Sequence, residues 1–363
     1  MSGHKRGVLG RRGAILLVAL LGTMAGVLAL RRGAGAHAKE APHAAQRTVL
    51  ESLPAGAVVA AELDLRALRN HPLTSAWFRE PRIIEGLGDI ATLCGADPLE
   101  QVERVAVAVP TSLDAGFAIV AQGDIDAGAL STCASRVILR REGKPIQEFI
   151  DGFSIVADGA VPGGARVAAR RGGPLFLAEP AYLARAMRVL SSSEPSLAAD
   201  PAHAALRRRV GEGVLVVTAL LSQEHRATLA SELERQGVVG SPLVGLASGA
   251  ISASLGEQLD CHVLLSCDEA AAASSLGDLL RAELKTQAAA PLAKLVGYAS
   301  LLERATVEVT GFDVHLRASL PPNDVLSVVR RVVALQRLTR SSAAAASSSP
   351  PTPASPVLQA PTK

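Results

Sequence analysis

The sequence predicts an α+β fold of two tandem similar units, each a mostly antiparallel sheet with helices on one face, behind an N-terminal transmembrane helix. Three observations predict this fold. An uncharged apolar run lies near the N-terminus. Several later segments alternate apolar and polar residues with period two, which is typical of strands with one buried face. The order of strand-like and helix-like segments recurs over two stretches of similar length, residues 57–190 and 213–338.

Residues 13–30 form the apolar run, 18 residues without a charged side chain. At ~1.5 Å per residue a helix of this length spans about 27 Å, enough to cross a hydrocarbon core. The preceding residues 1–12 are a basic tail, which the positive-inside rule places in the cytoplasm. We therefore expect an uncleaved signal anchor in the inner membrane, with the body facing the periplasm or the cell exterior.

Two alternatives concern the same segment. A secretory signal would be cleaved at Ala34-Gly35-Ala36 or Ala36-His37-Ala38, but Arg31 and Arg32 lie between the apolar run and those positions. Gly22 and Gly26 have the G-x-x-x-G spacing that allows two helices to approach closely, and self-association is one possible use of this face.

The exported part divides by composition. Residues 31–48 are small, polar and contain Pro, as in a tether, and residues 341–363 are a Ser/Ala/Pro tract that predicts a disordered tail. Between them we expect a first α+β unit over residues 49–191 and a second over residues 192–340.

In the first unit, short apolar or alternating segments predict strands, and longer amphipathic segments predict helices. The expected strands are residues 57–63, 104–109, 116–122, 147–157, 165–169 and 175–178, and the expected helices are residues 65–78, 126–136 and 181–190.

The second unit repeats this order and ends on a clear pattern. Val307 and Val309 alternate with polar residues before Gly311, and Phe312, Val314 and Leu316 do so after it, which predicts a hairpin with one wet face. The expected strands are residues 213–220, 249–255, 258–266, 305–310 and 312–319, and the expected helices are residues 223–236, 268–286, 291–302 and 323–338. In the last helix, one stripe is apolar and the opposite side is basic: Val325, Val328, Val329, Val332 and Leu335 against Arg330, Arg331 and Arg337.

The composition bounds the function. The chain has 363 residues, of which 48% are hydrophobic and 20% charged, with one Trp, two Tyr and six Phe. Few aromatic residues are available to stack on single-stranded nucleic acid. The net charge of +3 depends on the first 32 residues, and without them 31 basic residues face 34 acidic ones. No basic footprint for nucleic acid remains in the body, and we expect no nucleic-acid partner.

The sequence carries none of three common catalytic or nucleotide-binding motifs. The sequence contains no G-x-x-x-x-G-K-[ST], no G-x-S-x-G and no H-E-x-x-H. Glu62 and Asp64 share a strand face like the carboxylates of a glycosidase, but Asp64 directly precedes a predicted helix and is expected to be its N-cap. No catalytic residue and no cofactor are predicted.

Four cysteines are present. In an oxidising compartment they allow three pairings if all are bonded. Cys94 and Cys133 belong to the same unit, and their bridge is the preferred disulfide, with unpaired buried cysteines as the alternative. Cys261 and Cys267 lie on one strand about 20 Å apart, too far for a direct bridge unless the strand bends.

One cluster of polar residues is a candidate metal site. Asp260-Cys261-His262 and Asp313-Val314-His315 are D-x-H steps on two strands, with Cys261 and Val314 directed inward. The wet face should therefore carry five polar side chains, Asp260, His262, Glu308, Asp313 and His315. Imidazole and carboxylate suit zinc and related ions. The alternative is a solvated sheet face without a ligand.

The segment Leu53-Pro54-Ala55-Gly56-Ala57, with the strand and helix after it, resembles uncharacterised membrane-anchored envelope proteins of GC-rich bacteria. This resemblance implies location and architecture and brings no active site.

The predicted function is that of a non-catalytic, membrane-anchored extracytoplasmic binding or interaction protein, held in the inner membrane through residues 13–30. A face of small residues in the first unit, which can accept another layer, favours this function: Ala60, Ala106, Ala108, Ala118 and Val120. Either the second unit or a protein partner would supply that layer. The alternatives are an envelope hydrolase whose site is assembled from distant residues, and a structural component of the envelope.

Overall fold

The computed structural model describes residues 48–72, 74–75, 92–95, 98–110, 117–235, 241–328 and 331. The expected span at residues 13–30, the basic tail, nearly all of the tether and the C-terminal tail lie outside the described residues. Within the described part of the chain, no helix is both long enough and apolar enough to cross a membrane.

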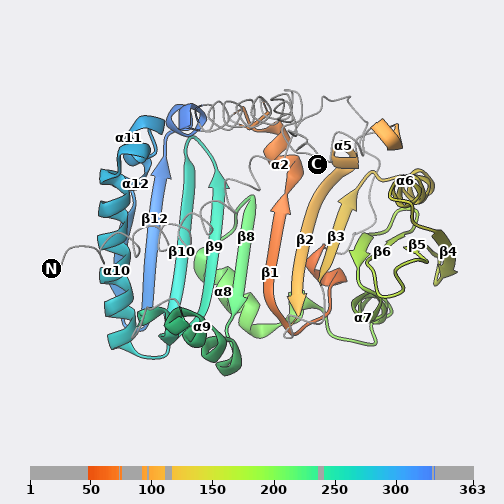
Figure 1. Ribbon diagram of the computed structural model, residues 1–363. Helices are drawn as coiled ribbons and strands as arrows, with labels where there is room; N and C mark the ends of the chain where they lie inside the picture. The colour runs from red at the N-terminus through yellow and green to blue at the C-terminus, as the bar shows by residue number, and fades with distance from the viewer. Residues whose placement is uncertain are drawn as a thin grey trace, which may run out of the picture.

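The described strands form one continuous antiparallel sheet (Figure 1). The strands are β1 Ala57–Asp64, β2 Val102–Pro110, β3 Ala118–Gly123, β4 Pro145–Ile150, β5 Phe153–Asp158, β6 Arg166–Ala169, β7 Leu175–Ala178, β8 Leu215–Leu220, β9 Leu246–Leu255, β10 Leu259–Cys267, β11 Thr306–Thr310 and β12 Asp313–Leu320. Their order across the sheet is β11-β12-β10-β9-β8-β1-β2-β3-β7-β6-β5-β4, which makes 12 strands. The α+β class with a large antiparallel sheet is confirmed.

The two halves of the chain meet edge to edge. β1 of the first half pairs with β8 of the second half, with Ala60 opposite Thr218 and Glu62 opposite Val216. These two strands therefore lie in the centre of the sheet, and β11 and β4 form its edges. The prediction of a separate sheet in each unit is therefore wrong. Backbone hydrogen bonds join the halves, and the second half does not lie as a layer on the first.

Helices pack on both faces of this sheet. Leu264 contacts α8 (Pro201–Val210), whereas the next residue, Leu265, lies in the cluster under α10 (Ala270–Ala289). Because consecutive strand residues point to opposite faces, these helices lie on opposite sides. We call the two sides the α8 face and the α10 face. The α8 face also carries α7 (Pro180–Leu190), and the α10 face also carries α2 (Leu65–Asn70) and α6 (Ala127–Arg140).

The prediction of helices on one face only is thus wrong, and β2 shows why. Val105 and Val107 point to the α10 face while Ala106 and Ala108 point to the α8 face. A strand that is apolar on both sides is typical of a sheet covered on both sides. The small-residue face lies within the chain's own core, because Ala106, Ala108 and Ala118 are 0% exposed beneath Leu53, Leu197 and α7.

Several boundaries differ from expectation. The expected strand 147–157 is a hairpin, β4 and β5, that turns at Asp151-Gly152 with φ of 51° and 78°, as a two-residue turn requires. The expected helix 291–302 breaks at Gly297, φ 77°, into α11 (Pro291–Val296) and α12 (Ala299–Glu303). Further helices are α5 (Pro98–Gln101), α9 (Gln223–Arg235) and the 3-10 turns η1 (Leu50–Ser52), η3 (Leu197–Ala199) and η4 (Pro242–Gly245), and residues 322–328 are also helical.

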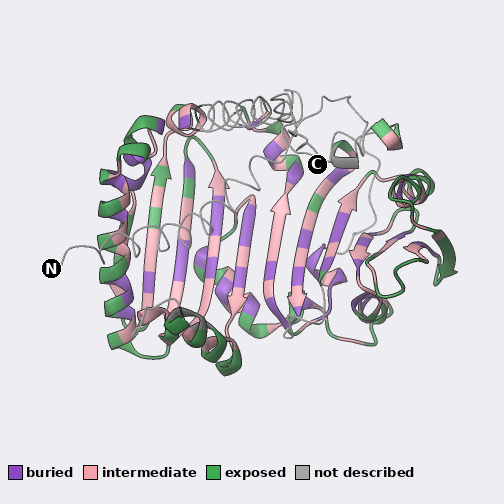
Figure 2. Ribbon diagram, in the orientation of Figure 1, coloured by how far each residue is buried: buried purple, intermediate pink, exposed green. Residues whose placement is uncertain are grey.

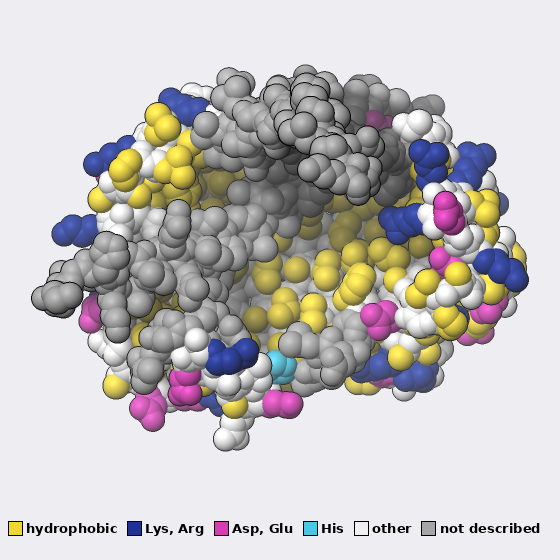
Figure 3. All heavy atoms as spheres, in the orientation of Figure 1, with side chains coloured by type: hydrophobic (Ala, Val, Ile, Leu, Met, Phe, Trp, Pro, Cys, Tyr) yellow, Lys and Arg dark blue, Asp and Glu magenta, His cyan; other side chains and the backbone are white. Residues whose placement is uncertain are grey.

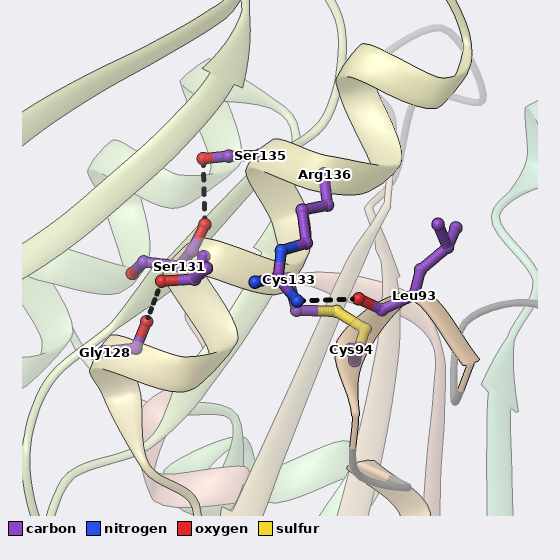
Figure 4. Close-up of a disulfide and its surroundings, with 8 residues drawn as sticks. Leu93, Cys94, Gly128, Ser131, Cys133, Ser135 and Arg136 are labelled. Atoms are coloured by element: carbon purple, nitrogen blue, oxygen red, sulfur yellow. Dashed lines mark hydrogen bonds between the residues drawn. A yellow bond between two sulfur atoms is a disulfide. The ribbon is translucent and has the colours of Figure 1, made fainter.

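The preferred disulfide is confirmed. Cys94 and Cys133 are bonded, with Cα atoms 4.7 Å apart, and the bridge ties the segment before β2 to α6 (Figure 4). The Arg136 side chain strengthens the same junction by donating to the Leu93 carbonyl at 3.0 Å. Cys261 and Cys267 are free, and burial, together with the nearby Asp260, raises the pKa of the Cys261 thiol to about 11.

We expect loss of this bridge to destabilise the first half of the molecule. It closes a loop with a sequence separation of 39, for which the loop-entropy model gives about 4 kcal/mol. Urea unfolding of a Cys94→Ser/Cys133→Ser variant should show a free energy of unfolding lower by about 2–5 kcal/mol. A Cys261→Ser variant is the control for loss of a thiol. An unchanged unfolding free energy in the double variant would contradict the structural role of the bridge.

Candidate functional site

His262 and His315 lie side by side on the α8 face. His262 is on β10 and His315 is on the adjacent β12. The two are diagonal neighbours on one face, because Arg317 is directly opposite His262 and His315 lies two residues before Arg317. Nε2 of His262 is 3.1 Å from Nδ1 of His315, and the rings stack with centroids 5.4 Å apart. The register of β10 and β12 thus brings together the two imidazoles that the D-x-H pattern puts on one face.

The C-terminal end of α8 occupies the other side of His262. The Val210 carbonyl, in the last turn of that helix, accepts from Ser252 Oγ at 2.7 Å and faces Nδ1 of His262 at 3.3 Å. A helix leaves its last carbonyls without partners inside the helix, so Ser252 and His262 serve as hydrogen-bond donors to the end of α8. One consistent assignment has His262 donating from Nδ1 to Val210 and accepting at Nε2 from His315 Nδ1–H.

The three predicted carboxylates do not join the imidazoles. Asp313 pairs with Arg209 at 2.5 Å and accepts from Ser266 at 2.7 Å. Glu308 lies 3.7 Å from Arg317, and Asp260 accepts from Ser319. Among the described residues, no group of three or more His, Cys, Asp and Glu side chains is placed to hold a metal ion. The geometry provides two ligands, fewer than the three or four protein ligands of zinc sites.

The surroundings shift two pKa values in this cluster. Burial lowers the pKa of His262, and the positive charge of Arg317 and the neighbouring His315 act in the same direction, against the hydrogen bond to Val210. Burial raises the pKa of Asp313, but hydrogen bonds from Arg209 and Ser266 outweigh it and leave that pKa below its ordinary value. The cluster therefore favours the neutral form of His262 and the ionised form of Asp313.

Glu62 and Asp64 border a groove of about 680 Å³ at the upper end of β1. Glu62 accepts from Arg207 at 2.6 Å. Asp64 caps α2 by accepting from the Ala67 N–H at 2.7 Å and also lies 3.5 Å from Arg104. The predicted N-cap is confirmed. Each carboxylate has a cationic neighbour, an arrangement that holds structure together and does not set up an acid–base pair.

The middle of the α10 face is a half-open apolar surface. Figure 3 shows hydrophobic side chains on the floor of a hollow in the middle of the sheet. The residues that point to this side from the central strands are only half-buried and are nearly all aliphatic: Val59, Ala61, Leu63, Val105, Val107, Val109, Ile119, Val217 and Ile251. Such a surface can take another apolar layer.

The sheet also ends in an exposed apolar edge at β4, which the sequence did not single out. Phe149 is 75% exposed, Ile150 45% and Ile146 42%, and Figure 2 shows the strand as exposed along its length. The Asp-Gly pair at residues 151–152 is the signal that would have divided the long expected strand and placed β4 at an edge.

Comparison with known proteins finds only distant similarity to solved structures. No protein-family model matches the chain, and no curated protein sequence matches it. Among solved structures, crystal form III of TP0453 is similar, with 11% sequence identity and a TM-score of 0.42, over 79% of this chain and 99% of that one. Crystal form I of TP0453 gives 11% identity and a TM-score of 0.41, over 80% and 100%. The resemblance to envelope proteins of GC-rich bacteria stays a prediction.

The histidine pair predicts a pH-dependent stability. Because the pKa of His262 is lower in the folded state than in the unfolded chain, the unfolded chain binds more protons below the ordinary imidazole pKa of 6.5. Stability is therefore highest above that pH and falls as the pH drops toward the folded pKa, by at most about 1.4 kcal/mol per pH unit for one proton.

Urea unfolding between about pH 7.5 and 5 should show a shallower pH dependence in His262→Gln than in the parent. His225→Gln, on α9, is the control for the same substitution outside this cluster. In the parent, removal of the cation in Arg317→Gln should raise the pKa of His262, which NMR of the imidazole protons measures. Equal slopes in the parent and His262→Gln would contradict this role.

Proposed function

We propose that this chain is an exported, membrane-anchored, non-catalytic binding protein that pairs an extended acidic segment of another protein along β4. The observation that carries the proposal is the edge strand itself. Three large apolar side chains of β4 are exposed, and among the described strands none pairs with the side of β4 that faces away from β5. An exposed, apolar edge strand is a ready template for another strand.

Two residues of β4 direct their backbone N–H and C=O groups away from β5. The Gly159 N–H donates to the Lys144 carbonyl at 2.7 Å, so the even-numbered residues of β4 bond toward β5. Alternation then turns the N–H and C=O groups of Gln147 and Phe149 to the open side. Pro145 has no N–H to offer, so the usable edge is short and ends at the turn after Ile150.

Charge selects the kind of partner. Residues 136–171, which surround β4, contain seven Lys and Arg against four Asp and Glu. This positive charge attracts an acidic segment and repels the same region of a second copy of the chain. In addition, two copies of the chain could pair along β4 with Gln147 of one copy opposite Phe149 of the other. The two Glu148 side chains would then be directly opposite each other, and like charges in that position destabilise a sheet.

Support for export comes from the cysteines. The Cys94–Cys133 bridge is of a kind that persists outside the reducing cytoplasm. It agrees with the anchor predicted at residues 13–30 and with a body in the periplasm or at the cell exterior.

We also infer that the body arose by duplication of one unit, with the halves at residues 49–191 and 192–340. The support is the strand order read outward from the centre. One direction reads β1-β2-β3-β7-β6 and the other reads β8-β9-β10-β12-β11, with a long helix, α6 or α10, after the third strand. The β4–β5 hairpin extends the first half only, so the proposed docking edge belongs to that half alone.

Export can be tested by counting thiols in cells. Full-length protein trapped with a maleimide reagent should show two reactive thiols per chain, since the bridge consumes the other two. Deletion of residues 1–30 should leave the chain in the cytoplasm with four. The anchored form should stay with membranes in alkaline carbonate. Four thiols in the full-length chain would overturn export, and a soluble product beginning near residue 37 would overturn the anchor.

The edge can be tested with a synthetic probe of alternating Val and Thr flanked by Asp, against the same probe flanked by Lys. Fluorescence anisotropy should show tighter binding of the Asp probe. Because a Phe side chain contributes about 1.5–3 kcal/mol when buried, Phe149→Ala should weaken it about tenfold or more. Phe149→Pro, which also removes an outward N–H, should abolish it.

Phe312→Ala is the matched control, because Phe312 is also exposed, at 55%, but lies in the turn between β11 and β12. It should leave binding unchanged. Equal affinity for the two probes, or unchanged binding in Phe149→Pro, would contradict the proposal. Concentration-dependent dimerisation that Phe149→Pro removes would replace the acidic partner with a second copy.

A further inference from the structure

A polar cleft of about 560 Å³ lies between α6 and the strands β4, β5 and β6, at the opposite end of the sheet from the histidine pair (Figure 1). Two buried hydroxyl groups form its floor. Ser131 of α6 and Ser154 of β5 are 5% and 9% exposed, and their Oγ atoms are 2.9 Å apart. The other polar side chains that line the cleft belong to Thr132, Ser135, Gln147, Arg170 and Arg171.

The hydroxyl protons that α6 brings to this cleft are already used within the helix. Thr132 donates to the Gly128 carbonyl at 3.0 Å, and Ser135 donates to the Ser131 carbonyl at 2.9 Å. A hydroxyl group has one proton to donate and two lone pairs that accept. The oxygens of Thr132 and Ser135 are therefore left as acceptors for the hydrogen bonds of a ligand.

A chain of hydrogen bonds orients the Gln147 amide in a similar way. Ser131 Oγ donates to the Ala127 carbonyl at 2.9 Å, so in its contact with Ser154 the donor is Ser154. Gln147 Nε2 then donates to Ser154 Oγ at 2.8 Å. The amide nitrogen is held by the floor, and the amide oxygen accepts no hydrogen bond from the described residues. This oxygen is a third acceptor.

The charge of the cleft is positive. Arg170 and Arg171 follow β6 and are exposed, and neither forms an ion pair with a carboxylate in the described part of the chain. The Arg170 guanidinium lies 4.8 Å from the centre of the Phe153 ring. None of the described lining residues is acidic, and Glu148 of β4 lies 3.7 Å from Arg166 instead. Because a guanidinium only donates, this end of the cleft requires an anionic acceptor.

We propose that this cleft binds a sugar acid, a carboxylate carried on a hydroxylated ring. The carboxylate pairs with Arg170 and Arg171, whose planar guanidinium groups match its geometry. The ring hydroxyls donate to the three acceptor oxygens, on Thr132, Ser135 and Gln147. A carboxylate without hydroxyls leaves those acceptors unpaired, and a neutral sugar leaves the two cations unpaired. The ligand that satisfies both sets carries both groups on one molecule.

Phe149 provides an apolar wall at the rim of the cleft. It is 75% exposed and lies on the same side of β4 as Gln147, two residues before it. Its ring gives the C–H groups of a sugar ring a surface to pack against. Binding in the cleft uses the side chains of these two residues, whereas strand addition at β4 uses their backbone groups. This inference is therefore independent of the proposed protein partner.

Galacturonate is the probe for this site, with galactose and acetate as its neutral and its hydroxyl-free counterparts. Their affinities for the purified full-length protein are measured by NMR titration. Galacturonate should bind about tenfold more tightly than either counterpart, because each of those satisfies only one set of partners. A galacturonate trimer that binds more tightly than the monomer would identify an acidic polysaccharide as the source, and equal binding would identify a free sugar acid; both results support the site.

Two sets of variants locate the binding. Arg170→Gln/Arg171→Gln should weaken galacturonate about tenfold or more, to the level of galactose. Arg140→Gln/Arg141→Gln, at the C-terminal end of α6, removes the same charge outside the cleft and should leave the affinity unchanged. Thr132→Val keeps the shape of the side chain and removes one acceptor. It should weaken galacturonate about threefold to tenfold and leave the weaker binding of acetate as it was.

Three results would overturn the proposal. Acetate that binds as tightly as galacturonate would make this a site for simple anions. Equal affinity for galacturonate in the parent and in Arg170→Gln/Arg171→Gln would place the binding elsewhere. Galacturonate that binds no more tightly than galactose would leave the two arginines without a role in recognition.

Discussion

The pairing of β1 with β8 is the interaction on which the rest of the molecule depends, because it makes one sheet from two halves of the chain. The helix α8 reinforces this pairing from one side. His203, 1% exposed, lies between Thr218 Oγ1 at 2.7 Å and the Ala57 carbonyl at 2.9 Å, so it contacts both strands at once. Arg207, one turn later, binds Glu62 of β1 at 2.6 Å. A helix from the connection between the halves thus holds both central strands.

Joining the halves edge to edge has a consequence for packing. A sheet this wide has two large faces, and its central strands are apolar on both, so each face requires its own cover. On the α8 face, η1, α7 and α8 fill the space completely around Ala106 and Ala108. On the α10 face, the described helices α6 and α10 lie toward the two ends and the short α2 packs on Leu63 and Val105, so these helices leave the middle half-open. The location of the hollow follows from this uneven distribution of helices.

Much of the fold was predictable, since period-two alternation located β1, β2, β3 and β8 to β12 within a few residues. The Asp64 cap and the Cys94–Cys133 bridge were predictable for local reasons. Sheet order was not, because alternation says which side of a strand is buried and nothing about its neighbour. The helix α8 was missed despite its Asp200-Pro201 start, because it is short and three consecutive arginines in its last turn interrupt the apolar pattern. For the site, the alternation of residues along each strand put His262 and His315 on one face, but only the register set them in contact. Asp313 forms an ion pair with Arg209, a residue distant in sequence, and so does not join the two imidazoles.

The two edges of the sheet differ in a way that bears on function. β11 alternates exposed Thr306, Glu308 and Thr310 with half-buried valines, and Arg281 of α10 reaches its backbone by donating to the Val307 carbonyl at 3.3 Å. Charge and a covering helix are the ordinary protections of an edge strand. β4 has Glu148 and Pro145, yet it exposes Phe149 and Ile150 beside them. One edge of the described sheet thus carries these protections and the other exposes apolar side chains, which supports the proposed addition of a strand at β4.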